Sequence, residues 1–513
     1  MKPIITAACA AGWVQDGDTI TTSGFVASVM PEALTRALEK RFLETGSPKN
    51  LTLFYAAAQG NRDGSGADHF AHEGMIKRVI GGHWNMVPRL GEMVLANKIE
   101  GYNFPQGTLS QLYRDIAGHR IGTITHVGLN TFVDPRLEGG KLNDKTKEDL
   151  VQVVEILGQE KLLYKAMPLQ IGFIRGTYAD ENGNVTMDHE VATIEATSIA
   201  QAVHNSGGKV IVQVKRVIEN GTLDPKMVKI PGIYVDALVV SEDPTDHEQC
   251  VGCDYDGSMC GEYRVPLNSL NYPSMSAKKI IGRRAAMELV PNSVVNLGIG
   301  IPEYISMVAS EEGIGDYMTL TVESGPVGGI PQGGARFGGS VNPEAILDQP
   351  YQFDFYDGGG VDCAFLGLAQ ADRCGNINVS KFGPRIAGCG GFINITQNAK
   401  KVFFCGTFTA DGLKTHVENG KLIIDQEGRS KKFIDQVEQI TFSGTYAQRV
   451  NQPVMYITER AVFELRSDGV YLTEVAPGID LHTQIIDLMG FEPKIDHRLM
   501  DTRIFSDSLM GLK

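Results

Sequence analysis

Glu323 is the residue of this 513-residue chain whose surroundings most clearly suggest chemistry. It follows the apolar run 318–322, which has the length of a buried strand, and it precedes Ser324-Gly325. A carboxylate at the carboxyl end of a strand lies where open α/β sheets bind ligands. The adjacent glycine would let a substrate reach the side chain. Glu323 is therefore a candidate nucleophile, and a turn residue or helix-capping acid is the alternative.

Glycine-rich segments accompany Glu323 in the second half of the chain. They lie at 297–302, 323–329, 333–339, 357–360 and 387–392. None fits the phosphate loop Gly-x-x-x-x-Gly-Lys-Ser/Thr, and no clean dinucleotide fingerprint follows a strand. Gly390 and Gly391, with Gly298 and Gly300, are instead candidates for backbone N–H groups that stabilise an oxyanion. The alternative for each glycine is that it only permits a turn.

Several separated motifs stand in a defined order along the chain. They are Pro105-Gln106-Gly107-Thr108, the segment 297–302, Glu323-Ser324-Gly325, and the stretch 379–383 that leads to 388–391. In this order they resemble the motifs of the family I coenzyme A transferases, with the α-like half fused before the β-like half. The resemblance covers essentially the whole chain and is strongest to single-chain members of short-chain acyl metabolism.

The resemblance implies a ping-pong reaction through a glutamyl-CoA thioester on Glu323. The substrates would be acyl-CoA and free short-chain carboxylates such as acetate and propionate. Coenzyme A would be a co-substrate, and no further cofactor is implied. Gln106 would hold the acceptor carboxylate, and Gly24 would shape a small acyl pocket. Gly298 and Gly300 would also line the substrate site.

Other activities remain open on the same residues. A 3-oxoacid CoA-transferase would use acetoacetate as its acceptor. An acyl-CoA thioester hydrolase would use water in place of the acceptor and would release CoA without one. A protein that only senses CoA or a metal would bind without turnover, and a glutamate at a glycine-lined strand end argues against that reading.

Two groups of side chains could suggest a metal. The first group occupies one short stretch: His247, Cys250, Cys253 and Cys260. Zinc sites usually pair two separated clusters, which this stretch does not provide. The second group is His69 and His72, whose spacing differs from the four-residue spacing of zinc proteases. We predict no metal.

Charge and cysteine usage limit the partners and the compartment. The net charge of −14 and the pI near 5.3 argue against nucleic acid and anionic lipid as partners. The chain contains no apolar run long enough for a membrane helix. Residues 4–11 faintly resemble a secretory signal, but they are better explained as a helix before a turn. The eight scattered cysteines indicate free thiols and a cytoplasmic protein. The family resemblance implies a homo-oligomer.

The elements that must position these residues alternate along the chain. Apolar runs of strand length alternate with helical patterns, which predicts α/β layers with mainly parallel sheet. Residues 179–187 resemble 371–379, and each of two strand ends rich in glycine precedes a Pro-Glu helix start, at Pro31-Glu32 and Pro302-Glu303. Such ordered pairs indicate an internal duplication.

The prediction is therefore two tandem homologous open-sheet α/β domains of the CoA-transferase type. The α-like domain would span 1–220, a polar linker 221–275, and the β-like catalytic domain 276–513. Ser276 would begin the first helix of the second domain. The basic pairs at 278–279 and 283–284 would form a solvated face of that helix, although a CoA phosphate could use one of them.

Overall fold

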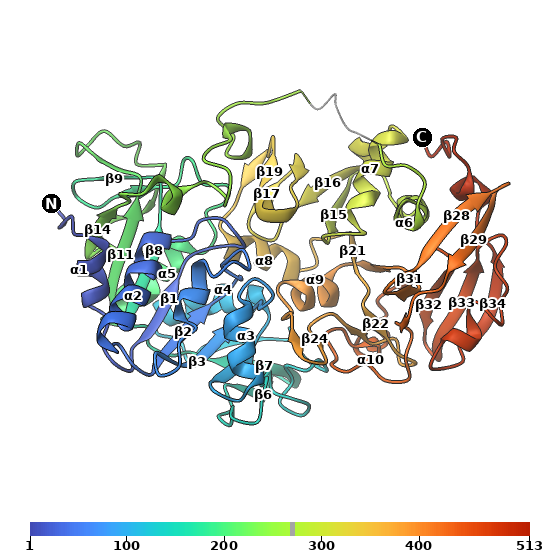
Figure 1. Cartoon of the computed structure of the whole chain (residues 1–513), viewed down its shortest axis with the longest axis horizontal. Coiled ribbons are helices and arrows are strands. Elements are labelled where there is room, and N and C mark those ends of the chain that lie inside the picture. The colour runs from blue at the N-terminus through green and yellow to red at the C-terminus, as the bar shows by residue number, and fades with distance from the viewer. Residues whose placement is uncertain (267–271) are drawn as a thin grey trace. The chain divides into compact units, whose positions relative to one another are not determined.

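The computed structural model describes residues 1–266 and 272–513 (Figure 1). The chain forms two compact units, each assembled from three stretches of sequence. Unit 1 comprises Met1–Val265, Val322–Asp354 and Pro384–Asn394. Unit 2 comprises Pro266–Thr321, Phe355–Gly383 and Ile395–Lys513. Both units contain a large open sheet with helices between its strands, so the predicted α/β fold class is confirmed.

Unit 1 is built on a seven-stranded sheet with the order β14-β11-β8-β1-β2-β3-β4, in which every neighbouring pair is parallel. The strands are β1 (Thr19–Thr22), β2 (Leu51–Tyr55), β3 (Ile76–Gly81), β4 (Glu100–Asn103), β8 (Ile171–Arg175), β11 (Lys209–Val214) and β14 (Ala237–Val240). Because all the strands run in one direction, their carboxyl ends share one edge of the sheet. The loops that follow β1, β2, β3 and β4 therefore begin at the same edge, which is where such sheets bind ligands.

Helix α1 (Ala7–Gly12) precedes the first strand, and several longer helices of unit 1 follow strands. They are α2 (Glu32–Thr45), α3 (Pro88–Leu95), α4 (Gln106–Ala117) and α5 (Ala196–Asn205). Helix α2 begins directly after Pro31, as the sequence predicts, and ends at Gly46 in a left-handed conformation with φ 68°. Leu34 of this helix, Leu53 of β2 and Phe173 of β8 are fully buried in one apolar core. This core holds the strand ends rigid beneath the loops.

Unit 2 contains a second sheet, with the order β16-β15-β21-β26-β31-β32-β33-β34 within the unit. Its strands are β15 (Ser293–Leu297), β16 (Met318–Thr321), β21 (Cys363–Gly367), β26 (Lys401–Cys405), β31 (Val454–Ile457), β32 (Ala461–Arg466), β33 (Gly469–Val475) and β34 (Lys494–Leu499). The pairs from β16 to β31 are parallel, and β31-β32 and β32-β33 are antiparallel. Helix α7 (Glu303–Glu311) begins directly after Pro302, which matches the second predicted Pro-Glu start.

Helix α6 (Ala277–Ala286) corrects one expectation about charge. Ser276 caps it by accepting a hydrogen bond from the Lys279 N–H, so the predicted start is right. Of the four basic residues only Lys278 is exposed, as predicted, because Lys279, Arg283 and Arg284 are all less than a tenth exposed. The Arg283 guanidinium donates to backbone carbonyls of the segment 503–508, and Arg284 pairs with Glu474. Arg283 thus fastens the carboxyl-terminal segment and Arg284 fastens strand β33, so neither is available to a CoA phosphate.

The segment predicted as a linker, 221–275, is divided between the units, with 221–265 in unit 1 and the remainder in unit 2. Strand β14 lies inside it and forms one edge of the seven-stranded sheet. Residues 267–271 of this segment lie outside the described residues. The compact units reflect packing and not sequence similarity, so the boundaries of the two homologous domains stay a prediction.

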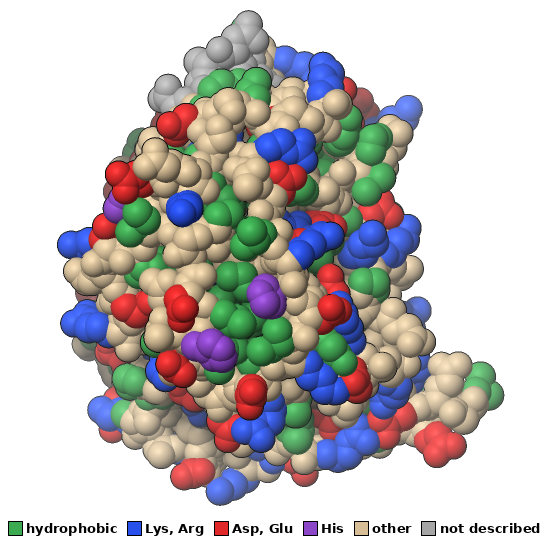
Figure 2. Space-filling view, turned by 90° about the vertical axis from the view of Figure 1, so that its right-hand side faces the viewer, with side chains coloured by type: hydrophobic (Ala, Val, Ile, Leu, Met, Phe, Trp, Pro, Cys, Tyr) green, Lys and Arg blue, Asp and Glu red, His purple; other side chains and the backbone are tan. Residues whose placement is uncertain are grey.

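Surface charge is mixed on the face shown in Figure 2, where basic and acidic side chains lie among one another. The net charge of −14 is therefore not gathered there into one acidic field. Among the described residues, no helix combines the length and the apolar character needed to cross a membrane.

Candidate active site

A tight turn in unit 1 holds Glu323. The Val322 N–H donates to Pro326 O at 2.9 Å, and the Gly325 N–H donates to Val322 O at 3.0 Å. The Ser324 hydroxyl donates to Gly338 O at 2.5 Å. These bonds fix the backbone on both sides of Glu323, so its carboxyl needs little further ordering before it reacts.

The Glu323 carboxyl lies against Gly391. The Gly391 backbone N–H donates to the carboxylate, and a Cβ added to Gly391 would overlap Glu323 Oε2. Burial raises the pKa of Glu323 to about 7, although the Gly391 hydrogen bond opposes that rise. The residue still keeps partial access to solvent. A desolvated and reachable carboxylate is a stronger nucleophile than one solvated by bulk water.

Gln106 lies beside the same glycine loop, at the first residue of α4, directly after Pro105 and three residues after β4 ends. Its backbone N–H donates to Gly390 O at 2.9 Å. Its side chain is 2% exposed, and its Nε2 has no hydrogen-bond partner within the described part of the chain. A buried amide without a partner is costly unless a ligand supplies one. The structure thus brings Gln106 to the group around Glu323.

Gly390 adopts a left-handed conformation with φ 52°, which favours glycine at this position. Its N–H donates to Gly82 O at 2.7 Å, at the end of β3. That donor is already engaged, so of the two neighbouring glycines only Gly391 directs its N–H at the carboxylate. The catalytic role predicted for Gly390 stays a prediction.

Gly24 follows β1 at the same edge of the sheet, with φ 146°. A Cβ at Gly24 would lie 2.9 Å from Gln59 Cγ and 3.3 Å from Met30 Cγ, so the surrounding space is small. The next residue, Phe25, packs against Gly338, whose carbonyl accepts from Ser324. Gly24 is therefore linked through Phe25 and Gly338 to the turn that carries Glu323.

Gly298 and Gly300 follow β15 in unit 2. The Gly298 N–H donates to Phe365 O at 2.8 Å, and the Gly300 N–H donates to Glu303 Oε1 at 2.9 Å. Both N–H groups are thus engaged within unit 2. Their predicted part in substrate binding stays a prediction.

His83 and Phe353 join the group but are absent from the sequence-based set. A Cβ on Gly390 would lie 3.5 Å from His83 Cδ2, and one on Gly391 would lie 3.0 Å from Phe353 Cζ. Burial and the nearby charges of Arg62 and Arg385 lower the pKa of His83 to about 4, so its imidazole is neutral at ordinary pH. The sequence did carry a signal for His83, because it follows Gly81-Gly82 at the end of an apolar strand. Phe353 offers no comparable signal.

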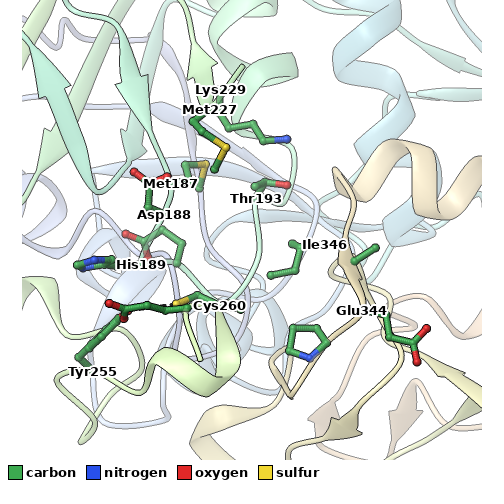
Figure 3. Close-up of a pocket in the computed structure, with 15 residues that line it drawn as sticks. Met187, Asp188, His189, Thr193, Met227, Lys229, Tyr255, Cys260, Glu344 and Ile346 are labelled. Atoms are coloured by element: carbon green, nitrogen blue, oxygen red, sulfur yellow. Dashed lines mark hydrogen bonds between the residues drawn. The ribbon is translucent and has the colours of Figure 1, made fainter. Parts of the chain in front are cut away.

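A separate cavity of about 530 Å³ also lies in unit 1 (Figure 3). His189, Tyr255 and Cys260 lie on one side of it and Glu344 on the other. Carboxylates outnumber its single lysine, Lys229, which itself pairs with Asp348 at 3.2 Å. This lining is poorly suited to phosphates.

Members of the two groups considered as metal sites contact other residues. His69 lies between Glu32 and Glu39, with its ring nitrogens 2.7 Å and 2.5 Å from their carboxylates. Cys250 and Cys253 form a two-residue hairpin through reciprocal backbone hydrogen bonds. In the portion of the chain that the structure describes, no three His, Cys, Asp or Glu side chains are grouped so as to hold a metal ion. All eight cysteines are free.

Comparison with known proteins decides which family this site belongs to. The profile of the coenzyme A transferase family matches residues 4–241. Acetate CoA-transferase YdiF of Escherichia coli K12 is 44% identical over 512 residues, which cover 99% of this chain and 96% of the relative. The chain belongs to the coenzyme A transferase family. The predicted family and the predicted enzyme class, a CoA-transferase, are confirmed.

Two further similarities extend over the whole CoA-transferase chain. Caffeate CoA-transferase of Acetobacterium woodii is 45% identical over 519 residues, covering 100% of this chain and 99% of the relative. The crystal structure of the acyl-CoA transferase YdiF of Escherichia coli O157:H7, in a thioester complex with CoA, superimposes with a TM-score of 0.93 at 43% identity. That similarity covers 99% of this chain and 97% of the YdiF chain.

Proposed function

We propose that this CoA-transferase moves CoA between a short-chain acyl-CoA and a free short-chain carboxylate, acetate or propionate, with Glu323 as its nucleophile. The observation that carries the proposal is the Glu323 carboxyl, which is desolvated yet reachable and accepts a hydrogen bond from the Gly391 N–H. The similar proteins named for acetate and for a thioester complex with CoA support this choice of substrates and intermediate.

The reaction balances without ATP because one thioester is exchanged for another. A Glu323 carboxylate oxygen attacks the thioester carbonyl, the C–S bond breaks, and an acyl-glutamyl anhydride and CoA thiolate form. The thiolate then attacks the glutamyl carbonyl and releases the donor's carboxylate, which leaves a glutamyl-CoA thioester. The acceptor carboxylate reverses both steps and departs as the new acyl-CoA.

Each protein group has a definite part in these steps. The Gly391 N–H would stabilise the oxyanion that develops at Glu323 as the thiolate attacks its carbonyl. The unpartnered Gln106 Nε2 would donate to the acceptor carboxylate, which satisfies an otherwise orphaned buried amide. Gly24 would limit the acyl pocket to small chains. A neutral His83 adds no positive charge that would stabilise the Glu323 carboxylate and weaken it as a nucleophile.

Intact-protein mass spectrometry tests the proposal. Propionyl-CoA alone should add the mass of CoA less water to the wild type, and acetate should discharge the adduct as acetyl-CoA. Glu323→Gln should form no adduct and should lose at least about 10⁴-fold in turnover. Steady CoA release without an acceptor and without an adduct would favour the hydrolase. Discharge by acetoacetate but not by acetate would favour the 3-oxoacid enzyme.

We further propose that the enzyme is a cytoplasmic homo-oligomer. Its eight free cysteines suit a reducing compartment. Light scattering coupled to size-exclusion chromatography would give the subunit number, and a mass of 55.7 kDa would indicate a monomer and contradict the proposal.

A further inference from the structure

Two arginines without carboxylate partners converge beside the group around Glu323. The Arg62 guanidinium donates to the backbone carbonyl of Asn85 at 3.1 Å, and the Arg385 guanidinium donates to the Asn85 side chain. Within the described residues, neither guanidinium forms an ion pair. Both arginines are exposed, so a ligand in solution can reach their guanidinium groups. Two positive charges held on one asparagine repel each other unless an anion joins them.

The two arginines line one cavity. Its volume is about 420 Å³, and its walls include Trp84, Pro88 and Ile386. Glu92 is its one carboxylate, so positive charge is in excess. Arginine forks match the geometry of phosphate oxygens, and a cavity of this size is typical of small-ligand sites.

The cavity is connected to the site by short steps along the chain. Asn85 lies two residues after His83, which faces Gly390. Arg385 begins the short strand β25 (Arg385–Ile386), from which the chain continues to Gly390 and Gly391. The N–H groups of Trp84 and Asn85 both donate to Ala387 O, at 2.8 Å and 3.0 Å. The loops that carry the cavity therefore also carry the residues around Glu323. The charges of both arginines also act on His83.

We propose that the Arg62–Arg385 cavity binds a phosphate group of CoA while its thioester lies at Glu323. This inference rests on the proposed function for its substrate. CoA is the one substrate with phosphates, and they are separated from its sulfur by a long pantetheine arm. Binding energy from that remote arm can be used to lower the barrier at the reacting carbonyl.

Comparing acetyl-CoA with acetyl-pantetheine, which lacks the phosphates, tests the proposal. With acetyl-CoA, Arg62→Gln and Arg385→Gln should each raise KM about tenfold, because each removes a charge-assisted hydrogen bond. The KM for the acceptor should not change. With acetyl-pantetheine, both variants should match the wild type in kcat/KM. The control is Arg120→Gln, because Arg120 is an exposed arginine of unit 1 that already pairs with Asp115.

Three outcomes would overturn the proposal. An unchanged KM for acetyl-CoA in the double variant would remove the cavity from CoA binding. An equal loss with acetyl-pantetheine would mean that the arginines act on the fold and not on phosphate. If the double variant loses inhibition by inorganic phosphate but keeps the wild-type KM for acetyl-CoA, the occupant of the cavity is a free anion and not CoA.

Separate measurements decide whether the cavity binds CoA phosphate and whether Glu323 carries the transferase reaction. If the wild type forms no glutamyl-CoA adduct, the proposed function fails. Calorimetric titration of CoA and of pantetheine then tests the cavity without turnover. Tighter binding of CoA than of pantetheine that is lost in the double variant supports the cavity, and equal CoA binding by wild type and double variant contradicts it.

Discussion

At the scale of single residues, the contact between Gly391 and Glu323 leaves no room for a side chain. A Cβ at position 391 would overlap Glu323 Oε2 and displace the carboxyl. We expect Gly391→Ala to lower kcat by about 10²-fold or more, because a displacement near 1 Å has such an effect. Gly12→Ala is the control, because Gly12 is exposed and a Cβ there would meet no atom within 4 Å. Normal adduct formation by Gly391→Ala would contradict the geometry.

The raised pKa of Glu323 also predicts the pH dependence of the reaction. Burial raises this pKa to about 7, so the carboxyl is protonated and unreactive at lower pH. We expect kcat/KM for acyl-CoA to rise with pH up to about 7 and then to level off. His83, with its pKa near 4, stays neutral over this range. A flat profile between pH 5.5 and 8 would show that Glu323 is already ionised in the free enzyme.

At the scale of elements, the loop after β3 and the glycine loop 387–391 hold each other in place. Gly388 has φ 80°, and a Cβ there would lie 2.8 Å from Trp84 N and 2.9 Å from His83 Cα. We expect Gly388→Ala to lower both the melting temperature and kcat, because the overlap adds about 1–3 kcal/mol to the strain of a left-handed alanine. Differential scanning fluorimetry and initial rates would measure the two effects.

The matched control for this prediction is Gly17→Ala. Gly17 has φ 83°, but a Cβ added there would meet no atom within 4 Å. Alanine at position 17 therefore has the strain of a left-handed backbone without any overlap of its Cβ with a neighbouring loop. Equal losses of stability at positions 17 and 388 would mean that the contact between the loops contributes nothing.

The sequence predicts the elements better than it predicts the arrangement of the site. The Pro-Glu helix starts, the parallel strands and the strand before Glu323 all follow from local patterns, since turn chemistry and apolar runs act within a few residues. The engagement of the Gly390 N–H by Gly82 could not be predicted, because it joins residues 308 apart along the chain. Burial of Arg283 cannot be predicted for the same reason, since its partners are carbonyls in the carboxyl-terminal segment.

At the scale of the whole molecule, a second buried carboxyl links stability to pH. Glu195 is 1% exposed, and neither of its oxygens has a hydrogen-bond partner in the described residues. Burial raises its pKa from 4.5 to about 8. Between pH 4.5 and about pH 8, Glu195 is protonated in the folded state but ionised in the unfolded state. The free energy of unfolding therefore falls as the pH rises through this range, by roughly 1.4 kcal/mol per pH unit.

Replacing the Glu195 carboxyl should remove the part of the pH dependence of stability that this carboxyl causes. We expect the melting temperature of Glu195→Gln to decline less than that of the wild type between pH 5 and pH 8. Glu181→Gln, at an exposed position, should behave as the wild type does. Parallel curves for Glu195→Gln and wild type would place the Glu195 pKa in its ordinary range.

The division of unit 1 into three stretches of sequence has a consequence for how the enzyme is made. Its last stretch ends at Asn394, roughly 130 residues after its first stretch ends at Val265. A ribosome adding about 5–20 residues per second needs roughly 6–26 s to cover that interval. Until the end of this time the chain lacks the glycine loop 387–391, and until residue 323 is added it also lacks Glu323. A nascent chain stopped anywhere in that interval lacks the Gly391 N–H that contacts Glu323, so we expect it to be inactive.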